Sequence, residues 1–147
     1  MGLKKIACCT DFSENADAAF ELACDLSEKY GAKLFVIHVI PPAVTPVVAD
    51  MEWALPEEPR DVLMAKTTER MQRTFQPKIG DRIDHELIVR DGHVSSQILD
   101  FLETHRMDLV VLGSYGLAGM GLVIFGSVAK RVAHKAPCSV MIARVAE

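Results

Sequence analysis

Glycine and serine residues between positions 113 and 127 are spaced in a way that could hold a phosphate group. An apolar run over residues 109–112 ends in Gly113-Ser-Tyr-Gly116, and after nine further residues Gly126 and Ser127 open a helical pattern. Glycine lets backbone N–H groups approach an anion closely, and the first turn of a helix has unpaired N–H donors at the positive end of its dipole. The glycine spacing alone is a weak signal, but together with the flanking strand and helix it predicts a phosphate-binding loop.

An aspartate follows the first predicted strand, in the sequence Thr10-Asp11-Phe12-Ser13. In that position a carboxylate can accept hydrogen bonds from the hydroxyl groups of a ribose. It can also simply cap the helix that begins next. The residue types leave both interpretations open.

The elements that would position these residues alternate along the chain. Ser13 suits the N-cap of the first predicted helix, and Gly31 suits its C-terminal stop. The alternation predicts a single α/β domain over residues 1–147, with an open, parallel, Rossmann-like sheet of five strands and helices on both faces. Hydrophobic periodicity predicts strands over residues 4–10, 34–40, 83–90, 108–113 and 139–145, and helices over residues 13–30, 59–78, 93–106 and 126–136.

The order of the strands decides where a ligand would bind. In the expected order 3-2-1-4-5, strands one and four are neighbours at the point where the winding direction reverses. The ligand crevice of an open α/β sheet lies at that switch point. Asp11 and the loop from Gly113 to Ser127 would then face each other across the crevice, and together they predict one ligand site.

Composition and charge restrict the class of partner. The chain has 147 residues, half of them apolar, and a net charge of −4. Its Lys and Arg residues are scattered, so we expect no nucleic-acid partner. No segment approaches the ~20 apolar residues of a membrane span, and the apolar part of the N-terminus is too short for a signal peptide. We therefore expect a cytoplasmic protein that does not bind membranes.

The cysteines and histidines are expected to have structural roles. No Cys-x-x-Cys pair occurs, and Cys8 and Cys9 would point to opposite faces of a strand, so we expect free thiols and no metal site. His38 lies in an apolar strand, where a packed and hydrogen-bonded histidine is the expected state. A basic cluster near the end of the last predicted helix is expected to form a solvated face: Lys130, Arg131, His134 and Lys135.

The segment between Ile40 and Arg60 breaks the alternation of strands and helices. Five of the chain's seven prolines and its only tryptophan, Trp53, lie in it. Loops longer than about 12–15 residues are usually functional lids or disordered segments. The segment is either a connector or a lid in which Met51 and Trp53 contact a ligand or partner, and the sequence leaves both open.

The chain resembles the universal stress protein family over essentially its whole length. The glycine pattern is similar to that of the ATP-binding branch of the family, whereas a second branch lacks these glycines and does not bind nucleotide. The matching segments are Thr10-Asp11-Phe12-Ser13, His38-Val39-Ile40, Gly92 before the third helix, residues 108–114, and Gly126-Ser127-Val128-Ala129 leading to Ala136-Pro137-Cys138.

The resemblance implies a nucleotide site built from these segments. It places adenine on the backbone of Val39 and the ribose near Asp11 and Gly113. It also implies one set of residues that binds the phosphates and another that lines the pocket. The phosphate set is Gly116, Gly126, Ser127 and Val128, and the lining set is Cys9, Thr10 and Leu112.

The implied ligand is ATP with Mg²⁺, and the implied function is regulatory. Residues 117–125 contain no lysine or arginine, so phosphate binding would rest on backbone amides, Ser127 and the metal ion. The P-loop sequence and an activating base beside a serine are both missing, so we expect slow ATP hydrolysis at most. The alternatives are a dimeric interaction module of the same fold that binds nucleotide poorly, and an enzyme acting on a nucleotide.

Two partners are expected. The last predicted strand, residues 139–145, should lie at an edge of the sheet, where unpaired backbone groups need a cover. Antiparallel pairing with the same strand of a second copy would cover them under two-fold symmetry, and the resemblance implies this homodimer. A further protein partner, not identified by the sequence, would respond to nucleotide occupancy.

Overall fold

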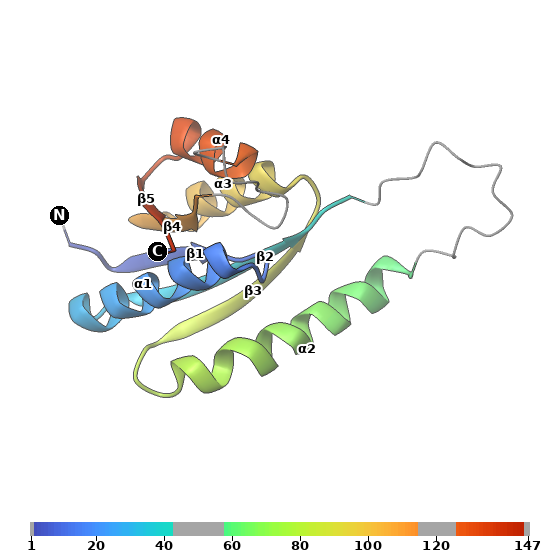
Figure 1. Ribbon diagram of the computed structural model, residues 1–147, viewed down its shortest axis with the longest axis horizontal. Helices are drawn as coiled ribbons and strands as arrows, with labels where there is room; N and C mark the ends of the chain where they lie inside the picture. The colour runs from blue at the N-terminus through green and yellow to red at the C-terminus, as the bar shows by residue number, and fades with distance from the viewer. Residues whose placement is uncertain (1, 43–57, 115–125, 146–147) are drawn as a thin grey trace, which may run out of the picture.

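Five parallel strands form one sheet, and helices pack on both of its faces (Figure 1). The computed structural model describes residues 2–42, 58–114 and 126–145. The strands are β1 (Lys5–Cys9), β2 (Lys33–Ile40), β3 (His85–Asp91), β4 (Leu109–Gly113) and β5 (Ser139–Ala143). The helices are α1 (Glu14–Tyr30), α2 (Arg60–Ile79), α3 (Val94–Thr104) and α4 (Ser127–Lys135).

The strand order is β3-β2-β1-β4-β5, which confirms the predicted fold. β1 pairs with β2 on one side and with β4 on the other, so the winding direction reverses between β1 and β4. The predicted bounds differ from the observed ones by one or two residues at an end. β5, for example, ends at Ala143 rather than at residue 145, because its partner strand β4 ends at Gly113, the residue opposite Ala143.

Each face of the sheet has its own apolar core. α1 and α2 cover one face, where Phe20 and Phe75 are buried, and α3 and α4 cover the other, where Phe101 and Leu102 are buried (Figure 1). The alternating side chains of the central strands feed both cores, as expected for a parallel sheet that is covered on both sides. Accordingly Cys8 belongs to the first core and its neighbour Cys9 packs against the second, which confirms their predicted opposite directions.

The ends of α1 match the sequence prediction. Ser13 is the N-cap, and its hydroxyl accepts a hydrogen bond from the Ala16 amide at 3.2 Å. Gly31 is the C-cap in a left-handed conformation with φ of 64°, which side-chain-bearing residues adopt only at a cost. The position of α1 is therefore set locally, and its first turn lies beside the end of β1.

Some predictions concern residues outside the described ranges. The proline-rich segment with Met51 and Trp53 and the loop with Gly116 both belong to this group. Within the described ranges, no helix is long and apolar enough to cross a membrane. All four cysteines are free thiols, as predicted.

Candidate functional site

The turn between β1 and α1 is held by its own side chains. The Phe12 amide donates to the Thr10 hydroxyl, and the Ser13 amide donates to Asp11 Oδ1, each at 3.0 Å. The Thr10 amide donates to the Ile37 carbonyl of β2 at 2.9 Å, which extends the strand pairing by one residue. Thr10 is buried and Asp11 is half-buried. The turn is thus a defined structure that presents Asp11 at the carboxyl end of β1.

Asp11 takes part in starting α1 without being its cap. Ser13 occupies the N-cap position, and the Asp11 carboxylate binds the Ser13 amide one step earlier in the chain. The carboxylate of Asp11 therefore supports the start of α1 by binding the N-cap residue, while the cap itself is Ser13, as predicted. Because a carboxylate has about four acceptor sites, the bond to Ser13 is compatible with further hydrogen bonds from a ligand.

His38 supports the same turn from β2. Its Nδ1 lies 2.7 Å from the Thr10 carbonyl oxygen. A carbonyl can only accept, so Nδ1 carries the proton. Burial lowers the pKa of His38 below its usual 6.5, and the nearby Arg70 acts in the same direction, while the Thr10 carbonyl and Asp11 act against them. The predicted role of a packed, hydrogen-bonded histidine is confirmed.

Gly113 brings β4 and α1 into close contact. A Cβ atom on Gly113 would lie 2.8 Å from both the carbonyl carbon and the oxygen of Asn15, and 2.9 Å from its Cβ. Real Cβ atoms essentially never approach other atoms so closely. Glycine at this position therefore has a steric reason, the approach of the first turn of α1, in addition to any role near a ligand.

The N-terminus of α4 follows the switch point on the other side. Gly126 is its N-cap, and no side chain caps the helix. The Gly126 amide donates to the Ser114 carbonyl at 2.6 Å, so this amide is engaged within the chain. The amides of Ser127 and Val128 have no partner inside the helix, because the first turn of any α-helix leaves its N–H groups unsatisfied. Of the predicted phosphate donors within the described residues, these two amides are the ones left to meet a ligand.

The predicted pocket residues Cys9, Val39 and Leu112 all face the core under α3 and α4. Val39 and Leu112 are buried, and burial, with the nearby Cys138, raises the pKa of Cys9 to about 12. Cys9 is therefore a neutral thiol. Since the Val39 side chain is packed away, only its backbone is left to meet a ligand. The structure thus brings these residues to the ends of β1, β2 and β4, on one side of the sheet.

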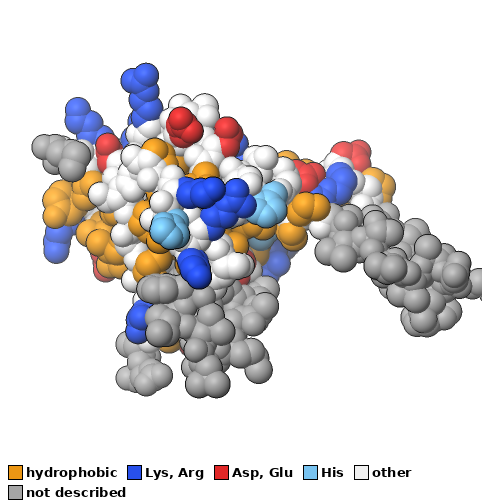
Figure 2. Space-filling view, turned by 90° about the horizontal axis from the view of Figure 1, so that it is seen from above, with side chains coloured by type: hydrophobic (Ala, Val, Ile, Leu, Met, Phe, Trp, Pro, Cys, Tyr) orange, Lys and Arg blue, Asp and Glu red, His pale blue; other side chains and the backbone are white. Residues whose placement is uncertain are grey.

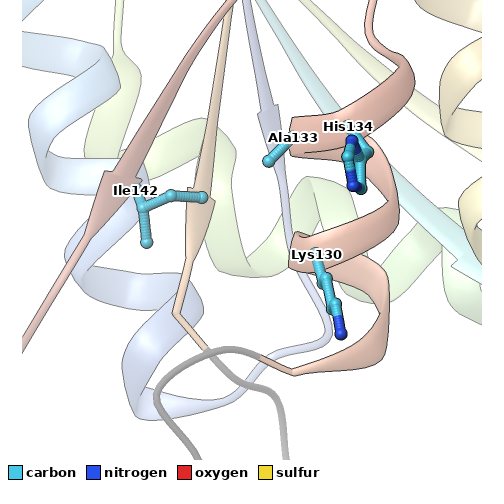
Figure 3. Close-up of a pocket in the computed structure, with 4 residues that line it drawn as sticks. All are labelled: Lys130, Ala133, His134 and Ile142. Atoms are coloured by element: carbon cyan, nitrogen blue, oxygen red, sulfur yellow. The ribbon is translucent and has the colours of Figure 1, made fainter.

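A separate groove of about 300 Å³ lies between α4 and β5 (Figure 3). Lys130 and His134, one helical turn apart on α4, stand on one side of it, and Ile142 of β5 points toward them. The four basic side chains of α4 are exposed, which confirms the predicted solvated face. Lys and Arg side chains gather on the surface that carries α4 (Figure 2). None of the predicted nucleotide residues that the structure describes lines this groove.

Among the described residues, no group of three or more His, Cys, Asp or Glu side chains could hold a metal ion.

The fold and the site define a doubly wound parallel α/β domain with an acidic turn and a helix N-terminus at its switch point. The chain belongs to the universal stress protein family, whose profile matches residues 2–144.

Individual relatives agree with this assignment. A universal stress protein of Methanocaldococcus jannaschii is 30% identical over 146 residues, which cover 96% of this chain and 82% of the relative. The solved structure of the universal stress protein UspA from Lactobacillus plantarum matches with a TM-score of 0.79 at 24% identity and covers 98% of this chain and 99% of that one. The universal stress protein from Archaeoglobus fulgidus, solved in complex with dAMP, matches with a TM-score of 0.63 at 23% identity over 97% of this chain and 99% of its own.

Proposed function

We propose that this protein is a cytoplasmic regulatory protein that binds ATP, with Mg²⁺ on the phosphates, at the switch point of its sheet. Asp11 binds the ribose, and the amides of Ser127 and Val128 bind the phosphates. The backbone of Val39 binds adenine, and Gly113 and Gly126 allow close approach. Occupancy of this site controls which surface the protein offers to a partner.

One observation carries the proposal. The winding direction of the sheet reverses between β1 and β4. The turn with Asp11 follows β1, and the N-terminus of α4, which no side chain caps, follows β4. The chain also belongs to the universal stress protein family. In open α/β sheets the point where the winding reverses is where ligands bind, and a helix N-terminus there favours an anion. The dAMP complex of the Archaeoglobus relative supports an adenine nucleotide as the ligand.

Titration calorimetry with ATP, AMP and GTP tests this proposal. We expect the wild-type protein to bind ATP more tightly than AMP or GTP, because amides of α4 bind the additional phosphates and the Val39 backbone distinguishes adenine from guanine. Gly126→Val should weaken ATP binding about tenfold or more while it leaves AMP binding nearly unchanged. Gly126 has φ of −69° and ψ of 163°, a conformation that valine adopts readily, so the fold should tolerate the change.

Ala133→Val is the matched control, because it adds the same branched side chain to an exposed position of α4 away from its N-terminus. It should bind ATP as the wild type does. No heat of binding with ATP up to about 1 mM would contradict the proposal and would favour the dimeric interaction module.

We also propose a homodimer formed by the edge strand β5. β5 ends the strand order. Its residue Met141 is 37% exposed, and Val145, two residues beyond its end, is 36% exposed. Such an edge invites pairing with another chain unless it is covered. The antiparallel two-fold pairing of β5 with its own copy would satisfy the outer backbone groups of both strands.

A proline at Ile142 is a specific test of this dimer. The Ser114 amide donates to the Ala143 carbonyl, so Ala143 directs its backbone groups toward β4 and Ile142 directs its own toward the open edge. Ile142→Pro removes an outward N–H and spares the bonds to β4, so sedimentation should show a monomer. Ile142→Ala, which keeps the N–H, should remain a dimer. A wild-type monomer at micromolar concentration, or a dimeric proline variant, would reject this interface.

A further inference from the structure

Phe12 adopts a backbone conformation that its residue type disfavours. Its φ is 65°, in the left-handed region, which is uncommon and energetically unfavourable for a bulky residue. The residue lies between Asp11 and the N-cap Ser13, inside the turn that forms one wall of the candidate site. Contacts of the Phe12 side chain must compensate for this cost.

The Phe12 ring is held between two other elements. The Arg70 guanidinium of α2 lies 3.7 Å from the centre of the ring, which is within the range of a cation–π interaction. The His38 ring of β2 lies on it with a centroid distance of 4.8 Å and a tilt of 48°. We call the residues His38, Phe12 and Arg70 the aromatic clamp.

The aromatic clamp also holds the backbone of the turn. His38 donates from Nδ1 to the Thr10 carbonyl, two residues before Phe12. The turn is therefore fixed on both sides of Asp11, at the Thr10 carbonyl by a hydrogen bond and at the Phe12 ring by its contacts with His38 and Arg70. The direction of the Asp11 carboxylate depends on both anchors.

We propose that the aromatic clamp positions Asp11 for binding the ribose of the nucleotide, with Arg70 acting through its contact with the Phe12 ring. This inference rests on the proposed nucleotide function. The three residues of the clamp are positioning residues. His38 and Arg70 contact the turn, Phe12 is part of it, and Asp11 of the same turn would bind the ligand. Their effect should appear in the binding of the nucleoside part of the ligand, whereas the phosphates lie on α4.

The affinity ratio between AMP and ATP separates this role from a general loss of structure. His38→Leu and Arg70→Met should weaken AMP and ATP by the same factor, about three- to tenfold, so that the ratio of their dissociation constants stays at the wild-type value. His38→Asn should bind within about twofold of the wild type, because the asparagine amide can donate from nearly the position of Nδ1. Rescue by asparagine but not by leucine identifies the hydrogen bond as the cause.

Lys78→Met is the matched control. Lys78 lies on the same helix, with its ammonium 6.0 Å from the ring centres of Phe20 and Phe75. Phe75 in turn stacks on Phe12 with a centroid distance of 6.0 Å, so Lys78 is one residue further from the turn than Arg70. Like Arg70→Met, the Lys78→Met variant removes a cation from an aromatic ring. It should therefore lower stability by about as much as Arg70→Met and leave the affinity for both nucleotides unchanged.

Amide hydrogen exchange gives a reading that needs no nucleotide. The amides of Phe12 and Ser13 are bound to side chains of the turn, and they should exchange faster in His38→Leu and Arg70→Met than in Lys78→Met. Unchanged exchange, or nucleotide affinities equal to the wild type, would overturn the positioning role while the proposed function stands. A wild-type protein that binds neither AMP nor ATP would overturn the proposed function and the positioning role together.

Discussion

Replacement of Gly113 by alanine should destabilise the protein by about 1–3 kcal/mol, the usual cost of forcing an extra methyl group into a packed site. The added Cβ would lie 2.8 Å from the backbone of Asn15, which cannot move without displacing the first turn of α1. That turn carries the N-cap Ser13 and follows Asp11, so nucleotide binding should weaken as well. Urea unfolding measures the loss of stability, and a thermal melt should show a decrease of several degrees.

Two controls separate the steric cause from the general effect of replacing glycine. A Cβ on Gly2 would have no atom within 4 Å, so Gly2→Ala should be neutral. The double variant Gly113→Ala with Asn15→Ala should remain as unstable as Gly113→Ala alone, because the closest atoms belong to the Asn15 backbone. Recovery of stability in the double variant, or a neutral Gly113→Ala, would show that the close approach does not constrain the fold.

The fold could be predicted because its signals are local and repeated. The alternation of strand and helix patterns predicts a parallel sheet, and a capping serine and a terminal glycine mark the ends of α1. The ends of β5 and β3 could not be predicted, since they depend on where a neighbouring strand stops. The end of β5, for example, is set by the end of β4 at Gly113.

The candidate site could be predicted only in part. Asp11 and the N-terminus of α4 follow strand ends and are visible as sequence patterns. The stack of Arg70 on Phe12 has no such pattern, because it joins a helix to a turn 58 residues earlier in the chain through packing alone. The left-handed Phe12 is also unexpected, since glycine or asparagine is the usual signal for that conformation. Gly113 was expected near a ligand, and only the structure shows its contact with Asn15.

The groove between α4 and β5 is a further feature without a sequence signal. It is formed by Ile142 of the edge strand and by Lys130 and His134 of the helix whose N-terminus we assign to the phosphates. A ligand at that N-terminus and a second copy on β5 would both touch elements that line the groove. In the proposed function the nucleotide and the partner surface would therefore be adjacent, as expected for a regulatory protein whose occupancy is read by another chain.

Hydrolysis of ATP by the isolated protein should be slow or absent. Fast phosphoryl transfer needs an oriented water molecule and a cation that stabilises the charge developing on the transferred group. No lysine or arginine occurs between Gly113 and Ala129, and Lys130 lines the groove beside Ile142. The loss of such a cation typically lowers the rate about 10³–10⁵-fold.

The Asp11 carboxylate is also unsuited to act as a base. Asp11 Oδ1 accepts the Ser13 amide, and Asp11 lies at the end of β1, where we place the ribose rather than the terminal phosphate. The rate of hydrolysis of bound ATP, measured in a single turnover, tests this expectation. The Gly126→Val protein, purified in the same way, is the control and gives the rate due to contaminating enzymes. A rate of about 1 s⁻¹ or more above that background, in the range of ordinary enzymes, would show that the protein is an ATP hydrolase. A rate equal to the background would mean that ATP acts as a bound ligand, which holds the protein in one conformation.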